Sequence, residues 1–472
     1  MGITTDRPVY NPLYLQVREI LLKRIVDGLY PKGALLPSES RLSAEFHTSI
    51  STIRQALSTL VAEGVLNKRQ GKGTFVSEQT LELSFLSWIG ETERGDEILR
   101  ELIRAFEGKH PAISIRLIPT TYYETRRELL RMISAGDAPD VAQIVTHWTS
   151  MFSSMGAFAP LEELLSRENL QDRLEAPDLQ AGTVQNHVYS VSWGLCPMAL
   201  IAHKGVLADA GLRVPEEALS LEEFYDLCSR VSEFYGGRKY GYALCISGDE
   251  TDFLRIYTFL QAFGGGFVTR EGRVIFNSPE NAAGFGWLRR LVQSVNLFIN
   301  DIYIIRKRFA DGDIAFISDG PWIRYLLEEL TGEPFERNFQ VVLNPRHAGA
   351  VSYSWNYNHA LAILSQSKKK PYAAKFVDAI TGDPEICSLY YRKIGMLPVS
   401  KSCLGAEAYN SAYYRTYRAQ LENIVPIQAE NPMFEKAMVL CIDAVKKILF
   451  DGADIQKELN EKQYYLKMLY YG

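Results

Sequence analysis

The sequence predicts a multidomain protein, with a small α+β domain at the N-terminus and a larger α/β body of two lobes. Three observations carry this prediction. Residues 36–76 combine short amphipathic helices with a glycine-containing hairpin, and strands alternate with helices from about residue 81 onward. The chain also has 472 residues, more than one hydrophobic core usually organises. We expect domains at 8–78 and 81–472, with lobes formed roughly by 81–190 plus 310–357 and by 193–306 plus 360–472.

The charge of the chain is divided unevenly between these two parts. Residues 1–79 hold ten Lys and Arg against seven Asp and Glu, a net charge of +3. The whole chain holds 51 and 56, so residues 80–472 hold 41 and 49, a net charge of −8. A basic N-terminal domain on an acidic body indicates that only the first part contacts nucleic acid.

The N-terminal domain is expected to contain three helices. An apolar period of about 3.6 residues predicts a first helix over 12–27, which Gly28 ends. Ser38 is suited to cap a short second helix that runs through 42–46. Turn-forming residues then lead into a third helix over 52–63, with its apolar residues inward and its polar residues outward. Two short helices joined by a turn predict a helix-turn-helix, whose second helix enters the major groove of DNA.

A basic hairpin follows the third helix. Two short strands, at 65–66 and 74–76, are joined by residues that include three cations and two glycines. Glycine lets a backbone approach phosphates closely, so we interpret this hairpin as a wing that contacts DNA rather than as a solvated turn. The candidate DNA-binding residues of the helices and the wing are Ser38, Arg41, Ser49, Ser51, Thr52, Arg54, Gln55, Lys68, Arg69, Gln70, Gly71, Lys72, Gly73 and Thr74.

The same segment resembles the GntR family of bacterial transcription regulators over about residues 13–76. The resemblance rests on Leu36-Pro-Ser-Glu39, Thr52-Ile-Arg54, Ala56-Leu57, Leu60, Glu63-Gly64 and Gly71-Lys-Gly-Thr-Phe-Val76. It implies a winged helix-turn-helix domain that dimerises on a near-palindromic DNA operator. Ser40 and Ile50 depart from the family, because cations are common at these positions. Each missing phosphate contact weakens DNA binding and its salt dependence, so the family's operator preference is not carried over.

The body begins after a short polar segment at 78–80. Its first elements are expected to be strands at 83–88, 114–119 and 141–145 and helices at 94–109 and 125–135. Alternation of this kind predicts parallel sheets covered by helices. About 390 residues are too many for one such sheet, so the sequence predicts two α/β lobes.

The sequence contains no recognisable enzyme, cofactor or metal motif. It lacks the nucleophile-elbow, phosphate-loop and dinucleotide-binding patterns, and its six cysteines and seven histidines show no ligand spacing. The triple glycine at 264–266 follows a predicted helix and is interpreted as a helix C-terminus. We therefore expect no catalytic residue, no cofactor and no bound metal.

Five of the six tryptophans fall at expected strand ends or in loops, whereas Trp287 lies in a helical pattern typical of a core position. In open α/β sheets, ligands bind beside the carboxyl ends of the strands, and flat aromatic faces suit sugar rings. Packing in the core is the alternative for each single ring, but the set favours a binding cleft. The candidate ligand-binding residues are Trp88, Glu91, Trp148, Trp193, Asp249, Asp252, Asp319, Trp322, Trp355, Asn356 and Tyr357.

From about residue 81 to the C-terminus, the body resembles the sugar-type solute-binding proteins of bacterial ABC importers. The resemblance rests on Phe106-Glu-x3-Pro111, Ala135-Gly-Asp-Ala-Pro-Asp-Val141, Gly156-x3-Pro160-Leu161, Val188-Tyr-x-Val-x-Trp193, Phe309-x2-Gly-x2-Ala315, Gly320-Pro-Trp322 and Gly395-x-Leu-Pro398. It implies the two-lobed α/β fold of periplasmic binding proteins, which closes on a ligand between the lobes. It also implies that the chain crosses between lobes near 189–193, 306–312 and 357–364.

Together these features predict a DNA-binding transcription regulator controlled by a small solute, a mono- or oligosaccharide. Its expected partners are a double-stranded DNA operator, the solute and a second copy of the chain. The first residues lack a secretion signal and no apolar run reaches 18 residues, so we expect a cytoplasmic protein without membrane contact.

Two alternatives stay open from the sequence. The body could be a degenerate sensor that binds no ligand. It could also be a pyridoxal-phosphate enzyme of the kind fused to some GntR-type domains. For that second alternative, Ser365-x-x-Lys368 is a partial match that lacks the following Pro-Gly-x-Arg.

Overall fold

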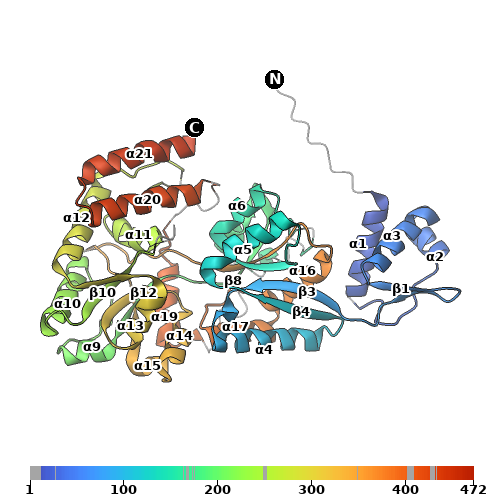
Figure 1. Cartoon of the computed structure of the whole chain (residues 1–472), viewed down its shortest axis with the longest axis horizontal. Helices are drawn as coiled ribbons and strands as arrows, with labels where there is room; N and C mark the ends of the chain where they lie inside the picture. Colours follow the sequence, from blue (N-terminus) through green and yellow to red (C-terminus); the bar gives the residue numbers. More distant parts are fainter. Residues whose placement is uncertain are drawn as a thin grey trace. The chain divides into compact units, whose positions relative to one another are not determined.

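The structure is a computed structural model of the chain. It describes residues 12–26, 28–162, 164–165, 170–172, 174, 176–247, 252–269, 271–347, 349–400, 409–425, 431 and 433–471. The chain divides into two compact units (Figure 1), the first formed by 1–143, 157–167 and 361–386 and the second by 144–156, 168–360 and 387–472. No helix within the described ranges is long and apolar enough to cross a membrane.

The first unit begins with a three-helix domain that carries a hairpin. Its elements are α1 (Leu13–Val26), α2 (Glu39–Glu45), α3 (Ile50–Ala62), β1 (Leu66–Arg69) and β2 (Gly73–Val76). Leu21, Leu42, Ile53 and Leu60 have no exposed surface and form the core between the helices. The three helices and the hairpin lie where the sequence predicts them. Ser38 caps α2 as expected, and α3 begins two residues earlier than expected because Ser49 caps it.

The hairpin is short and its register is fixed by its turn. β1 and β2 are antiparallel, with Leu66 opposite Val76 and Arg69 opposite Gly73. Gly73 has a φ of +110°, and a Cβ added there would lie 2.6 Å from the Leu35 Cδ1 atom. The exposed Leu35 side chain could move aside, but any other residue would strain the backbone at this φ, so glycine is favoured at this end of the tip.

The rest of the first unit is an α/β layer. Its elements are β3 (Leu81–Ser87), η1 (Ile89–Glu91), α4 (Glu93–Lys109), β4 (Ile113–Pro119), α5 (Tyr122–Ala135), β5 (Val141–Val145), β14 (His359–Ile363) and α16 (Lys370–Gly382); the end of β5 and the start of β14 belong to the second unit. The strand order begins β4-β3-β5-β14, and β3 is parallel to both β4 and β5. Phe376 of α16 lies 5.2 Å from Phe85 of β3 and 5.0 Å from Phe106 of α4, measured between ring centroids, so α4 and α16 share one face of this sheet.

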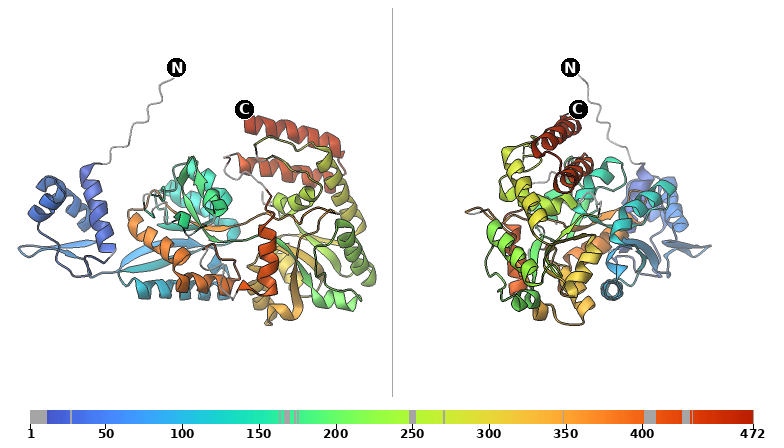
Figure 2. Two further views of the ribbon diagram at one scale, coloured as in Figure 1. Left: turned by 180° about the vertical axis from the view of Figure 1, so that it is seen from behind. Right: turned by 60° about the vertical axis from the view of Figure 1, so that its left-hand side comes forward.

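The second unit contains its own mixed sheet, in the order β11-β10-β12-β9-β13. Its strands are β9 (Ala199–His203), β10 (Tyr240–Cys245), β11 (Leu297–Asn300), β12 (Ile314–Asp319) and β13 (Phe339–Val342). β10 is parallel to β11 and β12, whereas β9 is antiparallel to β12 and β13. The sheet lies among many helices, of which α20 and α21 run side by side (Figure 2).

The other elements of the chain are mostly short or belong to the helical layers of the second unit. They are η2 (Thr146–Trp148), α6 (Thr149–Ser154), α8 (Ala176–Ala181), β6 (Thr183–Val184), β7 (His187–Val188), β8 (Ser190–Gly194), α9 (Lys204–Asp209), α10 (Leu221–Phe234), α11 (Asp252–Ala262), α12 (Pro279–Ser294), α13 (Ile302–Ala310), α14 (Ile323–Thr331), α15 (Phe335–Asn338), α17 (Pro384–Ile394), α19 (Ala412–Leu421), α20 (Phe434–Leu449) and α21 (Ile455–Tyr471).

The division into units differs from the partition expected from the sequence. Residues 310–357 were expected with 81–190, but β12 and β13 both pair with β9 and lie in the second unit. Residues 361–386, expected in the other lobe, lie in the first unit. The physical reason is that backbone pairing between strands distant in sequence assigns a strand to its sheet, and strand–helix alternation does not reveal that pairing.

Candidate DNA-binding surface and ligand-binding region

The N-terminus of α3 gathers several of the predicted DNA-binding hydroxyls. The Ser49 hydroxyl accepts a hydrogen bond from the Thr52 backbone N–H at 3.1 Å, which caps the helix. The same hydroxyl lies 2.7 Å from the Ser51 hydroxyl and 2.8 Å from the Thr52 hydroxyl. Ser49 and Ser51 are exposed, so this hydroxyl cluster is available to phosphate oxygens at a helix end whose dipole favours anions.

Glu39 of α2 positions two predicted DNA-contacting cations. Its carboxylate accepts hydrogen bonds from Arg54 Nη2 at 2.8 Å and Nε at 3.1 Å, and it lies 3.5 Å from Lys68 Nζ. The hydrogen bond from Arg54 is the main cause that lowers the pKa of Glu39 below its usual value. Glu39 thus holds side chains from α3 and from the wing next to each other, and DNA phosphates would compete with it for both.

The wing presents further cations from β1 and its turn. Lys68, Arg69 and Lys72 are exposed. The Arg69 guanidinium lies over the Phe75 ring, 4.7 Å from its centroid, and 3.5 Å from a Glu78 carboxylate oxygen. Of the other candidates, Arg41, Gln55, Gln70, Gly71 and Gly73 are exposed, Thr74 is half-buried, and the Ser38 hydroxyl accepts a hydrogen bond from the Arg41 N–H at 3.3 Å. The structure brings all fourteen candidates into one domain; their contact with DNA stays a prediction.

Four of the predicted ligand-binding residues belong to one aromatic cluster in the second unit, which we define as His147, Trp148, Trp322, Trp355, Tyr357, His359 and Phe434. The Tyr357 ring centroid lies 5.1 Å from that of Trp355, 5.4 Å from that of His147 and 6.0 Å from that of Trp322. His147 also contacts Trp148 at 6.1 Å and Phe434 at 5.8 Å. All seven side chains are buried. The cluster brings together side chains from four separate segments of the second unit.

Trp193 lies outside this cluster. It stacks on Tyr390 of α17, with ring centroids 3.9 Å apart and planes 7° from parallel, and has no exposed surface. In the first unit, Trp88 contacts Tyr122 edge-on at 5.8 Å, and the Glu91 carboxylate accepts a hydrogen bond from the Tyr122 N–H at 3.1 Å. These two predicted ligand residues therefore lie together at the start of α5.

The predicted polar ligand residues of the second unit make contacts within the chain. Asp319 is fully buried and pairs with Arg306 through two hydrogen bonds, of 2.6 and 2.9 Å. Asp252 accepts a hydrogen bond from the Ser247 N–H at 2.6 Å, and the Asn356 Oδ1 atom accepts one from the Cys196 N–H at 3.2 Å. Asp249 lies outside the described residues. Ligand binding by any of these side chains stays a prediction.

Sequence reasoning did not select His147, His359 or Tyr390, which contact the predicted residues. His359 stacks on Trp322 at 5.5 Å, and its Nδ1 atom lies 2.8 Å from the Tyr390 hydroxyl. Burial lowers the pKa of His359 to about 3, so the ring is neutral at pH 7. His147 could have been found, because it precedes Trp148 directly after the predicted strand 141–145; His359 carries no comparable signal. Among the described residues, no group of His, Cys, Asp and Glu is placed to hold a metal ion.

Comparison with known proteins gives two family matches. The model of the bacterial extracellular solute-binding protein family matches residues 101–413, and that of the gntR family of bacterial regulatory proteins matches residues 13–76. The chain is 45% identical over 91 residues to the "Probable fructoselysine utilization operon transcriptional repressor" of Escherichia coli (strain K12). It is 39% identical over 93 residues to the "HTH-type transcriptional repressor NagR" of Bacillus subtilis (strain 168). These matches cover 19% and 20% of this chain and only 37% of each repressor.

Solved structures are similar over the body of the chain. A solute-binding protein of an ABC transporter from Thermotoga lettingae TMO, bound with α-D-tagatose, superposes with a TM-score of 0.74 at 20% identity. The GacH receptor of Streptomyces glaucescens GLA.O gives 0.74 at 18% identity. Each match covers 83% of this chain, and 100% and 99% of those proteins, which establishes the fold of the body. The chain therefore belongs to the bacterial extracellular solute-binding protein family and carries at its N-terminus a regulatory domain of the gntR family.

Proposed function

We propose that this protein is a transcription regulator whose affinity for a DNA operator is controlled by a small carbohydrate bound to its solute-binding body. The observation that carries the proposal is the joining, in one chain, of a gntR-family domain to a body that matches sugar-binding proteins along almost their whole length. In such a fusion, the solute-binding body senses the ligand, and the DNA-binding domain carries the response to the operator.

DNA binding is supported by the arrangement of charge on the N-terminal domain. Arg54 of α3 and Lys68 of the wing share the Glu39 carboxylate, and all three side chains are at least partly exposed. Cations held on neighbouring elements can bind successive phosphates while the N-terminal residues of α3 reach base edges. We further propose that two copies of the chain act together, since one such domain reads only half of a near-palindromic site.

Carbohydrate binding is supported by the aromatic cluster and by the structural relatives. Rings such as Trp322 and Tyr357 offer the flat apolar faces that pack against sugar rings. The Trp355 indole N–H is buried and has no hydrogen-bond acceptor in the described part of the chain, so a ligand hydroxyl would satisfy it. The similar proteins solved with α-D-tagatose and with acarbose have this fold. We propose binding rather than catalysis, in the cytoplasm, where the operator DNA is found.

Two measurements on the full chain test this function. DNA fragments from upstream of the protein's own gene are titrated in fluorescence anisotropy at several salt concentrations, and specific binding is expected to weaken steeply with salt. Thermal unfolding is then followed with maltose, D-tagatose and a panel of other sugars. A ligand raises the unfolding temperature in proportion to RT ln(1 + [L]/Kd).

The operator titration is finally repeated with the sugar that stabilises the protein most. A change in operator affinity supports control by a carbohydrate. If DNA binds but every sugar leaves both the unfolding temperature and the operator affinity unchanged, the body is a degenerate sensor and the proposal fails.

A further inference from the structure

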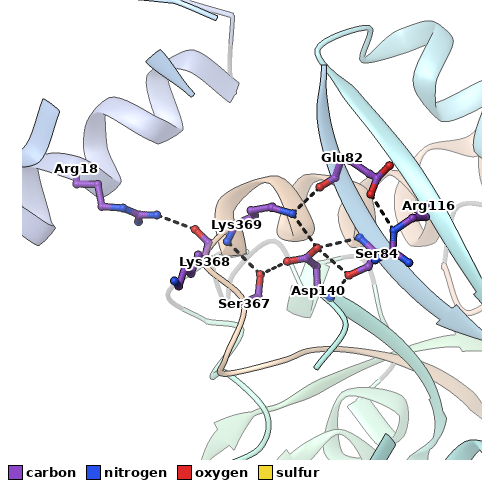
Figure 3. A network of polar contacts seen from close by, with 8 residues as sticks. All are labelled: Arg18, Glu82, Ser84, Arg116, Asp140, Ser367, Lys368 and Lys369. Carbon is purple, nitrogen blue, oxygen red and sulfur yellow. Dashed lines mark hydrogen bonds and ion pairs between the residues drawn. The ribbon is translucent and has the colours of Figure 1, made fainter. Parts of the chain in front are cut away.

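Arg18 of α1 links the end of α3 to the α/β layer of the first unit, which we call the first lobe. Its guanidinium forms hydrogen bonds of 3.0 and 2.7 Å to the carboxylate of Glu63, the residue that follows α3. The Arg18 Nη2 atom also donates to the Lys368 carbonyl oxygen at 2.7 Å. Arg18 is 8% exposed. One buried side chain therefore connects the end of α3 to a loop of the lobe; Figure 3 shows its contact with Lys368.

The loop that receives Arg18, residues 365–369, is fixed to the lobe by Asp140. The Ser367 hydroxyl donates to Asp140 at 2.7 Å, and Lys369 Nζ lies 3.5 Å from the same carboxylate. Asp140 also accepts hydrogen bonds from the Ser84 N–H and hydroxyl in β3, at 2.9 and 3.0 Å (Figure 3). Asp140, Ser84 and Ser367 are all buried, so these bonds are shielded from water.

This loop follows, along the chain, one of the segments that connect the two units. Three of the crossings lie between residues 143 and 144, 156 and 157, and 360 and 361. Asp140 directly precedes β5, which contains the crossing at 143–144, and the loop follows β14, which contains the crossing at 360–361. Ala157, at the second crossing, accepts a hydrogen bond from the Ser365 N–H at 2.8 Å. Residues beside three of the crossings therefore either contact the loop 365–369 or lead into it.

α1 also lies against α16 of the lobe, and further hydrogen bonds join the domain to the lobe. Lys375 of α16 donates to the Val26 carbonyl at the end of α1 at 2.6 Å, and Lys32 donates to the Pro111 carbonyl at 2.8 Å. Between α1 and α16 lies a groove of about 1140 Å³. Because a groove separates part of the two surfaces, the polar bonds contribute to the orientation of the domain.

We propose that Arg18, with Asp140 and the loop 365–369, forms the joint through which the ligand state of the body changes the orientation of the DNA-binding domain. This inference rests on the proposed function and names its route of regulation. Arg18 is a positioning residue: it contacts neither the candidate DNA-binding surface nor the aromatic cluster. A shift of the crossing segments is passed to the Lys368 carbonyl, from there to Arg18, and from Arg18 to the end of α3.

The test uses Arg18→Ala and Arg18→Lys in the full chain, with Arg24→Ala as the matched control. Arg24 also lies on α1 and pairs with a glutamate, Glu45, but it packs over Phe46 inside the N-terminal domain. Arg18→Lys keeps a charge for Glu63 and cannot hold both acceptors, because an ammonium lacks the planar fork of a guanidinium. Arg18→Lys therefore distinguishes an effect of losing the contact with Lys368 from an effect of misfolding.

The first readout is hydrogen exchange of the free protein. Residues 365–372 and the last turn of α3 are expected to exchange at least threefold faster in both Arg18 variants, and at the wild-type rate in Arg24→Ala. This readout needs neither sugar nor DNA. Unchanged exchange in Arg18→Lys overturns the joint, whatever the fate of the proposed function.

The second readout is the factor by which the most stabilising sugar of the panel changes operator affinity. In both Arg18 variants we expect this factor to be at least threefold closer to one than in wild type. The operator affinity measured without sugar and the sugar affinity measured without DNA should both stay within twofold of wild type. If the sugar changes operator affinity by the same factor in Arg18→Lys as in wild type, the inference is overturned. A wild-type protein that binds no operator or no sugar contradicts the proposed function instead, and hydrogen exchange then decides on the joint alone.

Discussion

In the N-terminal domain, the candidate residues all lie between Ser38 and Thr74 and most are exposed, whereas the aromatic cluster of the second unit joins His147 to Phe434 and is buried. The first site is built by local structure: two capped helices and a hairpin turn. The second requires four distant segments to pack together. Exposed cations held by surface ion pairs can exchange their partners for phosphates with little effect on stability. A buried ring can contribute both to the stability of the fold and to ligand binding. Experiments therefore have to measure unfolding free energy and sugar affinity separately.

The largest expected effect is at Trp193. Replacing this fully buried ring with Ala removes its stack on Tyr390 and leaves a cavity, so we expect a loss of about 3–5 kcal/mol in the free energy of unfolding. Urea unfolding measures this loss, and Trp193→Phe should cost clearly less. A Trp193→Phe protein that is as stable as wild type but has lost sugar affinity would show that Trp193 lines the ligand site instead.

Removing the cations of the wing should affect DNA binding and spare the fold. Replacing Lys68, Arg69 and Lys72 together with Ala removes up to three phosphate contacts. The slope of log K against log salt should then fall by up to about 2.7, and operator affinity by about 10- to 1000-fold. Anisotropy titrations at several salt concentrations measure both quantities.

A matched control is Lys457→Ala with Lys467→Ala on the exposed side of α21. These changes also lower the positive charge of the chain and should leave the slope unchanged. Equal losses in the wing variant and the control would mean that net charge, rather than the wing, governs DNA binding.

The stability of the second unit should depend on pH through His203. Burial lowers the pKa of His203 to about 4, from an ordinary value of 6.5, so the unfolded chain takes up this proton first as the pH falls. The stabilising contribution is complete above pH 6.5 and is lost as the pH falls toward 4. Between pH 7 and pH 5 we expect a loss of about 1–2 kcal/mol from this residue.

His203→Asn tests this assignment. The Nδ1 atom of His203 accepts a hydrogen bond from the Val206 N–H and caps α9, and Asn can make the same bond without titrating. Urea unfolding of wild type and variant is compared at pH 7 and pH 5. The variant should lose less stability than wild type; an identical loss would assign the pH dependence to other groups.

The smallest expected effect is at Glu39. Glu39→Gln removes a carboxylate that competes with phosphates for Arg54 and Lys68, so operator affinity should rise by about two- to fivefold. Because the ion pairs are exposed, the unfolding free energy should change by less than about 1 kcal/mol. Weaker operator binding in this variant would show that Glu39 is needed to hold Arg54 in place, rather than only to neutralise it.

The sequence by itself determined the elements of the N-terminal domain and its candidate surface. The caps Ser38 and Ser49, the apolar period of α3 and the glycines of the wing act within a few residues, so the sequence contains all of their causes. The strand Val141–Val145 was likewise predicted to the residue, because a short apolar run bounded by turn residues is a local signal.

Only the tertiary structure decided which strands share a sheet, which rings meet in the aromatic cluster and how the N-terminal domain contacts the lobe. β12 pairs with β9 across more than a hundred residues, Tyr390 meets Trp193, and Arg18 reaches the Lys368 carbonyl 350 positions away. Such contacts depend on how complete surfaces fit together, and no local periodicity encodes them. The sequence therefore indicated a gntR-type domain and a solute-binding body, and only the fold showed that Arg18 contacts the loop of Lys368.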